Sequence, residues 1–138
     1  MARYADINGR YLYLDVEGVE HRVYFEEAGE GIPLVCQHTA GSDGRQWRHL
    51  LEEKDITSRF RVIAVDLPFH GKSLPPYENR YWENEYKLKK DWFMSFWLSF
   101  VRELDLVQPV FMGCSMGGHL AADLAYHHPE QFRASIGI

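Results

Sequence analysis

Short apolar runs alternate along the chain with longer segments in which apolar residues recur every three or four positions. The short runs predict strands at residues 10–16, 23–27, 32–37, 60–65, 110–114 and 133–138. The longer segments predict helices at residues 46–56, 85–106 and 116–128. Two strands followed by alternating helices and strands predict an α/β fold, in which helices cover both faces of a mostly parallel sheet.

The predicted helix at 85–106 carries a stripe of large apolar residues. The stripe and its flanks consist of Trp92, Phe93, Phe96, Trp97, Phe100 and Leu104. At helical spacing we expect these side chains to pack against the sheet rather than to bind a ligand. Near the start of the same helix we expect a solvated charged face formed by Lys87, Lys89, Lys90 and Asp91.

Composition and charge narrow the classes of function. The 138 residues carry 15 Lys and Arg against 20 Asp and Glu, a formal net charge of −5. This acidic balance argues against nucleic acid as a partner, because phosphate binding needs a basic face. No apolar run reaches the roughly 20 residues that span a bilayer, and the first residues have no signal-peptide core. We therefore expect a single cytoplasmic domain with a small-molecule substrate and no membrane contact.

The two cysteines, Cys36 and Cys114, are too few for a disulfide framework. No cysteine, histidine or carboxylate has metal-ligand spacing with another. We therefore expect free thiols, no metal and no cofactor.

The segment 110–122 carries the clearest chemical signal. An apolar strand leads into Gly113-Cys114-Ser115-Met116-Gly117 and directly into an alanine-rich helix. A sharp strand-to-helix turn lifts a serine hydroxyl above the sheet edge, and the glycines leave room where side chains would clash. The helix directs free N–H groups toward a developing oxyanion. One alternative is an ordinary turn with an incidental serine; another is a nucleotide-binding turn, which would need glycine in place of Ser115.

With these features the sequence resembles the α/β-hydrolase family over nearly its whole length. Residues 113–117 resemble the nucleophile elbow. Residues 66–73 resemble the loop that follows a core strand, with Phe69 where glycine is usual, and residues 38–41 resemble the oxyanion loop, with Thr39 in place of the usual glycine. The resemblance implies the three-layer core of that family.

The resemblance also implies roles for individual residues. Ser115 is expected to be the nucleophile, and the backbone N–H of Met116 one oxyanion donor. The second donor is expected from Ala40, with Thr39 as the alternative. Serine at position 115 excludes the branch that opens halides and epoxides, which carries aspartate there.

The expected reaction is hydrolysis through an acyl-enzyme. Its substrates would be small apolar esters, or the carbon–carbon bonds of ring-cleavage products. The loop at 75–82 is expected near the pocket. Its aromatic residues, Tyr77, Tyr81 and Trp82, are equally consistent with packing inside the protein and with substrate recognition.

A serine hydrolase also needs a histidine base and an acid that orients it. In the resembled family both follow later strands, and too few residues follow Ser115 to hold them. We therefore expect residues 1–138 to form a partial core, truncated after about the sixth strand and lacking the cap and the C-terminal strands. The competing hypothesis is a non-catalytic fragment or interaction protein. The exposed edge of such a sheet predicts a homo-oligomer or a completing chain.

The histidines of the chain are poor substitutes for the missing base. His119 lies on a helix that runs beneath the sheet edge, away from the raised hydroxyl. His38 is expected to anchor the oxyanion loop and His70 to make structural hydrogen bonds. His21 and His49 are expected on the surface.

Overall fold

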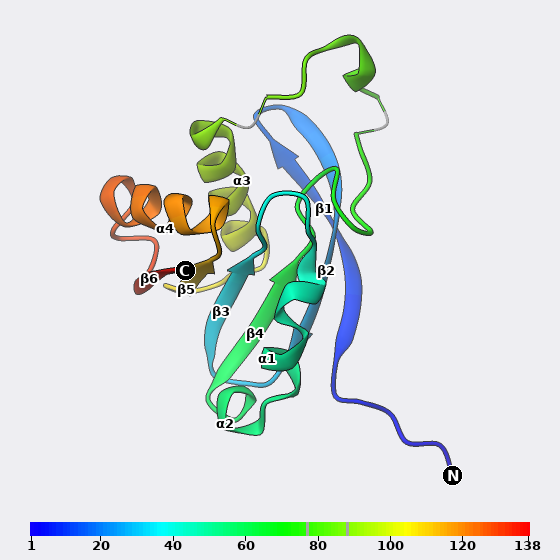
Figure 1. Cartoon of the computed structure of the whole chain (residues 1–138), viewed down its shortest axis with the longest axis vertical. Coiled ribbons are helices and arrows are strands. Elements are labelled where there is room, and N and C mark those ends of the chain that lie inside the picture. The colour runs from blue at the N-terminus through cyan, green and yellow to red at the C-terminus, as the bar shows by residue number, and fades with distance from the viewer. Residues whose placement is uncertain (77, 88) are drawn as a thin grey trace.

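The computed structural model describes residues 1–76, 78–87 and 89–138, and its centre is a six-stranded sheet (Figure 1). In chain order the strands are β1 (Asn8–Val16), β2 (Val19–Ala28), β3 (Ile32–Gln37), β4 (Phe60–Val65), β5 (Val110–Gly113) and β6 (Ala134–Gly137). Their order in the sheet is β1-β2-β4-β3-β5-β6. β2 is antiparallel to both β1 and β4, whereas β4, β3, β5 and β6 are parallel. The predicted mostly parallel α/β sheet is confirmed.

Helices cover both faces of this sheet. One face packs against the 3-10 turn η1 (Gly44–Trp47) and the short helices α1 (Arg48–Glu52) and α2 (Lys54–Thr57). The other face packs against α3 (Lys90–Glu103) and α4 (Met116–His127), which Figure 1 shows on the far side of the sheet from α1. A further turn, η2 (Tyr81–Glu83), lies in the long loop between β4 and α3.

The aromatic stripe of α3 forms the main core. Phe96, Trp97 and Phe100 are fully buried, and Trp92 and Leu104 pack at the edges of the cluster. The Trp97 ring meets Phe111 of β5 edge-to-face at 5.2 Å between centroids. The prediction that this stripe packs against the sheet is confirmed, and the charged residues Lys87, Lys89, Lys90 and Asp91 are exposed as expected.

The helices are shorter than the apolar pattern predicts. The segment expected as one helix at 46–56 is broken at Glu53, whose backbone is extended and whose carboxylate accepts the N–H of Asp55 at the start of α2. The helix expected from residue 85 begins at Lys90, because Lys89 is extended. Ahead of it, the Tyr86 ring contacts Phe69 at 5.0 Å between centroids instead of continuing the helical stripe.

His21 is the clearest departure from the expected surface. The sequence predicts an exposed residue, but only 4% of its surface is accessible. Buried positions alternate along β2 from Glu20 to Glu27, so His21 shares the inward face of the strand with Val23 and Phe25. The expectation was therefore wrong, whereas His49 is exposed as predicted.

β6 forms an outer edge of the sheet, and the isoleucines within it and directly after it stay open to solvent. Ile136 is 44% and Ile138 67% exposed. The expectation that a second copy or a completing chain pairs with this edge stays a prediction. Among the described residues, none of the helices has the length and hydropathy to cross a bilayer.

Candidate active site

Ser115 stands in the sharp turn between β5 and α4, in the left-handed region of backbone space. Its φ is 56° and its ψ −106°, and the residue is exposed. An L-residue in such a conformation costs about 1–3 kcal/mol and persists only where its surroundings hold it. Three hydrogen bonds do so: Ser115 N–H donates to Ile138 O at 2.7 Å, Cys114 N–H to Gln37 O at 3.2 Å, and Ile138 N–H to Gly113 O at 2.9 Å.

The glycines around Ser115 are required by close backbone contacts. A Cβ on Gly113 would overlap the backbone of Gly117, lying 2.7 Å from its Cα. A Cβ on Gly117 would lie 3.0 Å from the carbonyl oxygen of Gln37. The close packing of the first turn of α4 on β5 and β3 therefore explains the glycines of the Gly-x-Ser-x-Gly pattern.

In the first turn of α4, the backbone N–H that directly follows Ser115 is left without a partner within the described chain. Gly117 N–H donates to Cys114 O at 2.9 Å, and His119 N–H donates to Ser115 O at 3.0 Å. The N–H of Met116 has no acceptor among the residues that the structure describes. A helix N-terminus adds positive potential at this position.

The loop that follows β3 is held in place by His38. Leu67 N–H donates to its Nε2 at 3.1 Å, so the neutral ring carries its proton on Nδ1, which donates to Thr39 O at 2.7 Å. Burial lowers the pKa of His38, and the bond to Thr39 opposes this only in part. This arrangement agrees with the expected anchoring role. His70 lies alongside, with its ring 4.9 Å from that of His38 and its Nδ1 2.9 Å from Pro68 O.

The two proposed second donors differ in how their N–H groups are used. Thr39 N–H donates to Oε1 of Gln46 at 2.9 Å. No acceptor for Ala40 N–H lies among the described residues. Gly41 follows with φ +71°, which turns the loop back toward η1.

The segment 66–73 joins this loop to the sheet through Asp66. Its Oδ1 accepts Gly44 N–H and its Oδ2 accepts Lys72 N–H, both at 2.7 Å. The hydroxyl of Ser73 donates to Asp66 O at 2.5 Å. Phe69 takes φ +68°, so it keeps the left-handed conformation that glycine usually supplies at this position.

A pocket of about 350 Å³ lies beside Ser115, between α3 and α4. Phe93, Met116 and Leu120 form its apolar lining. Lys90 and Asp123 line its outer side, with their charged groups 3.9 Å apart. Tyr81 and Trp82 line a different cavity, and Tyr77 lies outside the described residues.

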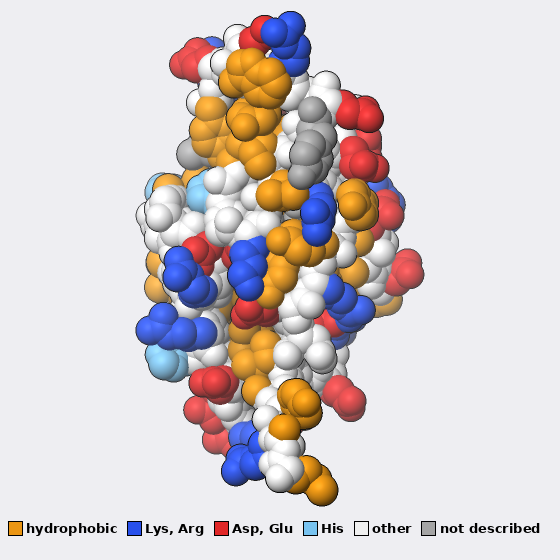
Figure 2. Space-filling view, turned by 90° about the vertical axis from the view of Figure 1, so that its right-hand side faces the viewer, with side chains coloured by type: hydrophobic (Ala, Val, Ile, Leu, Met, Phe, Trp, Pro, Cys, Tyr) orange, Lys and Arg blue, Asp and Glu red, His pale blue; other side chains and the backbone are white. Residues whose placement is uncertain are grey.

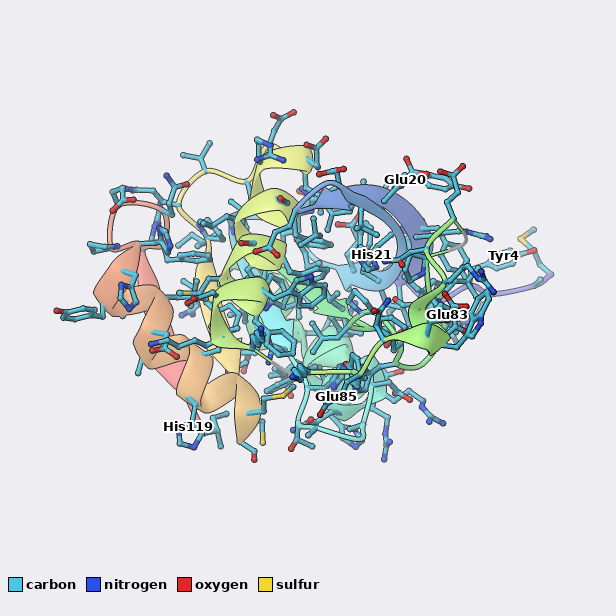
Figure 3. All side chains as sticks on the ribbon, turned by 90° about the horizontal axis from the view of Figure 1, so that it is seen from above. Tyr4, Glu20, His21, Glu83, Glu85 and His119 are labelled. Atoms are coloured by element: carbon cyan, nitrogen blue, oxygen red, sulfur yellow. The ribbon has the colours of Figure 1, made fainter. Side chains whose placement is uncertain are left out.

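Within the described chain, neither a histidine nor a carboxylate forms a hydrogen bond with the Ser115 hydroxyl. His119 lines the rim of the pocket, yet in Figure 3 its ring projects from α4 away from the rest of the molecule. His21, by contrast, lies among the interior side chains in the same view.

Sequence reasoning missed one residue beneath the elbow. The Gln37 side chain is fully buried and its Oε1 accepts Nε1–H of Trp97 at 2.6 Å. The signal in the sequence is a glutamine at the end of an apolar strand, because an amide placed there needs a hydrogen-bond partner. The Oε1 of Gln37 has such a partner, whereas its Nε2 has none among the described residues.

Comparison with known proteins places this geometry in a family. Residues 32–138 match the sequence family described as alpha/beta hydrolase fold. Bifunctional epoxide hydrolase 2 of Sus scrofa is 35% identical over 121 residues, which are 85% of this chain and 20% of that protein. The pimeloyl-[acyl-carrier protein] methyl ester esterase of Aeromonas hydrophila is 34% identical over 119 residues, 84% of this chain and 41% of that protein. The chain thus spans about two fifths or less of the length of these relatives.

Solved structures share the fold at lower sequence identity. Epoxide hydrolase VrEH1 from Vigna radiata superposes with a TM-score of 0.76 at 19% identity, covering 96% of this chain and 39% of that one. A thermophilic esterase from Thermogutta terrifontis gives 0.74 at 24% identity, covering 89% and 43%. Because the family match covers residues 32–138, well over half of the chain, the chain belongs to the alpha/beta hydrolase fold family.

Proposed function

We propose that this chain supplies the nucleophile and the oxyanion hole of a serine hydrolase, with Ser115 as the attacking residue. The observation that carries the proposal is the left-handed backbone of Ser115 beneath an exposed side chain. A serine with only a structural role gains nothing from that conformation, whereas a nucleophile gains access to a substrate carbonyl. Because Ser115 is not an aspartate, the proposal favours ester chemistry over the epoxide opening named for the Sus scrofa relative.

The oxyanion hole would consist of two backbone N–H groups. Met116 offers the first, and Ala40 is favoured for the second because the N–H of Thr39 is already bound to Gln46. Donors placed in this way stabilise the negative charge of a tetrahedral intermediate, and losing one typically slows a reaction about 100- to 1000-fold.

The proposed reaction is acyl transfer to water. The Ser115 oxygen attacks the carbonyl carbon, the alcohol leaves with a proton, and water then cleaves the acyl-enzyme. The pocket lined by Phe93, Met116 and Leu120 suits a small apolar acyl group. The same attack cleaves a carbon–carbon bond next to a carbonyl, provided that the departing carbon takes up the proton that the serine hydroxyl releases.

A second candidate function follows from one specific observation. The described residues place no histidine or carboxylate in hydrogen-bond contact with the Ser115 hydroxyl. Without a base the hydroxyl is a weak nucleophile. The alternative is therefore a non-catalytic protein that keeps the first part of the fold for interaction.

A fluorophosphonate probe separates the two candidates, because it labels activated serines. Because oxyanion donors keep part of a hydrolase's reactivity when the triad base is missing, we expect slow labelling of the folded chain. The labelling should disappear in Ser115→Ala and persist in Ser58→Ala, a control at another exposed serine. Absence of label on the folded chain, or label that survives Ser115→Ala, would contradict the proposal.

A further inference from the structure

A second cavity, of about 620 Å³, lies at the same edge of the sheet but shares no lining residue with the pocket at Ser115. β2 pairs Phe25 with Val65, the last residue of β4, so residues 19–24 run on beyond the end of β4 and form one wall. The long loop before α3 forms the other wall. Five aromatic residues line the cavity: Phe69, Tyr81, Trp82, Tyr86 and Trp92. We call this the aromatic cavity.

Much of this aromatic surface is open to solvent. Trp82 is 64%, Tyr86 55% and Tyr81 38% exposed. Figure 2 shows hydrophobic side chains gathered at the upper end of the molecule, where the loop between β4 and α3 lies in Figure 1. Aromatic groups clustered on an exposed surface in this way mark an interaction site more often than isolated ones do.

Phe69 stands at the centre of the aromatic cavity in a strained conformation. Its φ of +68° is one that glycine adopts at no steric cost. Its ring meets Tyr81 at 5.4 Å and Tyr86 at 5.0 Å between centroids, and His21 lies behind it at 6.5 Å. Because strained backbone conformations cluster at functional sites, the conformation of Phe69 beside a ligand-sized cavity suggests that its side chain contacts a ligand.

The charges that line the aromatic cavity sum to a negative value. Lys87 is paired with Glu85 at 3.1 Å. Burial lowers the pKa of His21, which keeps its ring neutral near neutral pH. The Glu17 carboxylate accepts a hydrogen bond from Ser95 at 3.0 Å and has no cationic partner among the described residues. The faces of the aromatic rings are themselves electron-rich.

A mostly apolar cavity with one unopposed carboxylate is complementary to an apolar group that carries a positive charge. The Arg80 guanidinium already lies over the Trp82 ring, 6.0 Å from its centroid. We propose that the aromatic cavity binds an alkylammonium group, held by the faces of Tyr81 and Tyr86 and by the carboxylate of Glu17. The site does not depend on the chemistry of Ser115, and binding to it is expected to survive Ser115→Ala.

The test compares choline with 3,3-dimethyl-1-butanol, which has the same shape without the charge. Indole N–H resonances of the folded chain report the site by NMR. We expect choline to shift the signals of Trp82 and Trp92, and to leave those of the buried Trp47 and Trp97 in place. Cation–π and Coulomb attraction predict that choline binds about tenfold more tightly than the alcohol. Equal affinity for the two probes, or no shift of either cavity indole at millimolar choline, would overturn the proposal.

Two variants locate the binding determinants. Glu17→Gln is expected to weaken choline binding about threefold, whereas Glu20→Gln, in the same hairpin but outside the cavity lining, leaves it unchanged. Tyr86→Leu keeps the cavity apolar and removes a ring, so it should weaken choline binding without weakening that of the alcohol. The same affinity in Glu17→Gln and Tyr86→Leu as in the parent chain would count against the assigned site.

Discussion

A single buried hydrogen bond ties α3 to the strand beneath the elbow, and its removal gives a sharp prediction. Trp97 donates from Nε1 to Oε1 of Gln37 at 2.6 Å, with both side chains fully buried. Trp97→Phe deletes the donor and shrinks the ring. Trp47→Phe is the matched control, because Trp47 is also buried but its indole N–H has no hydrogen-bond partner among the described residues.

The magnitude follows from what each substitution leaves behind. Both remove a similar apolar volume, so the packing loss largely cancels in the comparison. Only Trp97→Phe leaves the buried acceptor on Gln37 without a hydrogen-bond partner, which costs about 1–3 kcal/mol. We therefore expect Trp97→Phe to lower the free energy of unfolding by about 1–3 kcal/mol more than Trp47→Phe does.

Urea denaturation measures both values, and a double-mutant cycle isolates the bond. In a Gln37→Met background the acceptor is gone, so the cost of Trp97→Phe should fall by about 1–2 kcal/mol. The reasoning is refuted if the two tryptophan variants are equally destabilised, or if the coupling energy stays below about 0.5 kcal/mol with an unchanged m-value.

Two further predictions concern the elbow and the loop that faces it. Gly113→Ala drives a Cβ into the backbone of Gly117 and should cost about 3 kcal/mol or more, whereas Gly41→Ala, with φ +71° and open space around it, should cost only about 1 kcal/mol in the same urea assay. Burial lowers the pKa of His38 below its usual 6.5, so the unfolded chain binds more protons and the free energy of unfolding falls as the pH drops below that value. Urea titrations at about pH 7.5 and about pH 5.5 should show a smaller fall in His38→Gln and the parent fall in His49→Gln; equal falls in all three proteins would contradict the assignment.

The sheet could be predicted because its signals are local. The strands at 32–37 and 60–65 are apolar runs bounded by turns, and the structure places them at the same residues. The helix boundaries could not be read in the same way. The break at Glu53 depends on one side chain capping one backbone N–H, and the start of α3 at Lys90 depends on Tyr86 packing against a distant loop.

The same distinction between local and long-range contacts applies to the candidate site. Ser115 and its glycines could be found from the sequence, because the close contacts that require them lie within one strand-turn-helix unit. The burial of His21 could not be found from its neighbours' chemistry alone. It depends on Phe69 and Trp92, which come from two other segments of the chain, and only the alternation of β2 hinted at it.

Ser115 and Phe69 are both non-glycine residues with positive φ at the carboxyl ends of parallel strands, yet they are held by different forces. Backbone hydrogen bonds from Gln37 and Ile138 fix the turn at Ser115, and such bonds do not depend on which side chain the residue carries. Aromatic contacts with Tyr81 and Tyr86 surround Phe69, so there the side chain itself supplies the compensation. In the proposed function the first arrangement presents the Ser115 hydroxyl to a substrate, and in the proposed aromatic site the second places a ring against a ligand. Because different contacts hold the two residues, the two proposed sites can change independently.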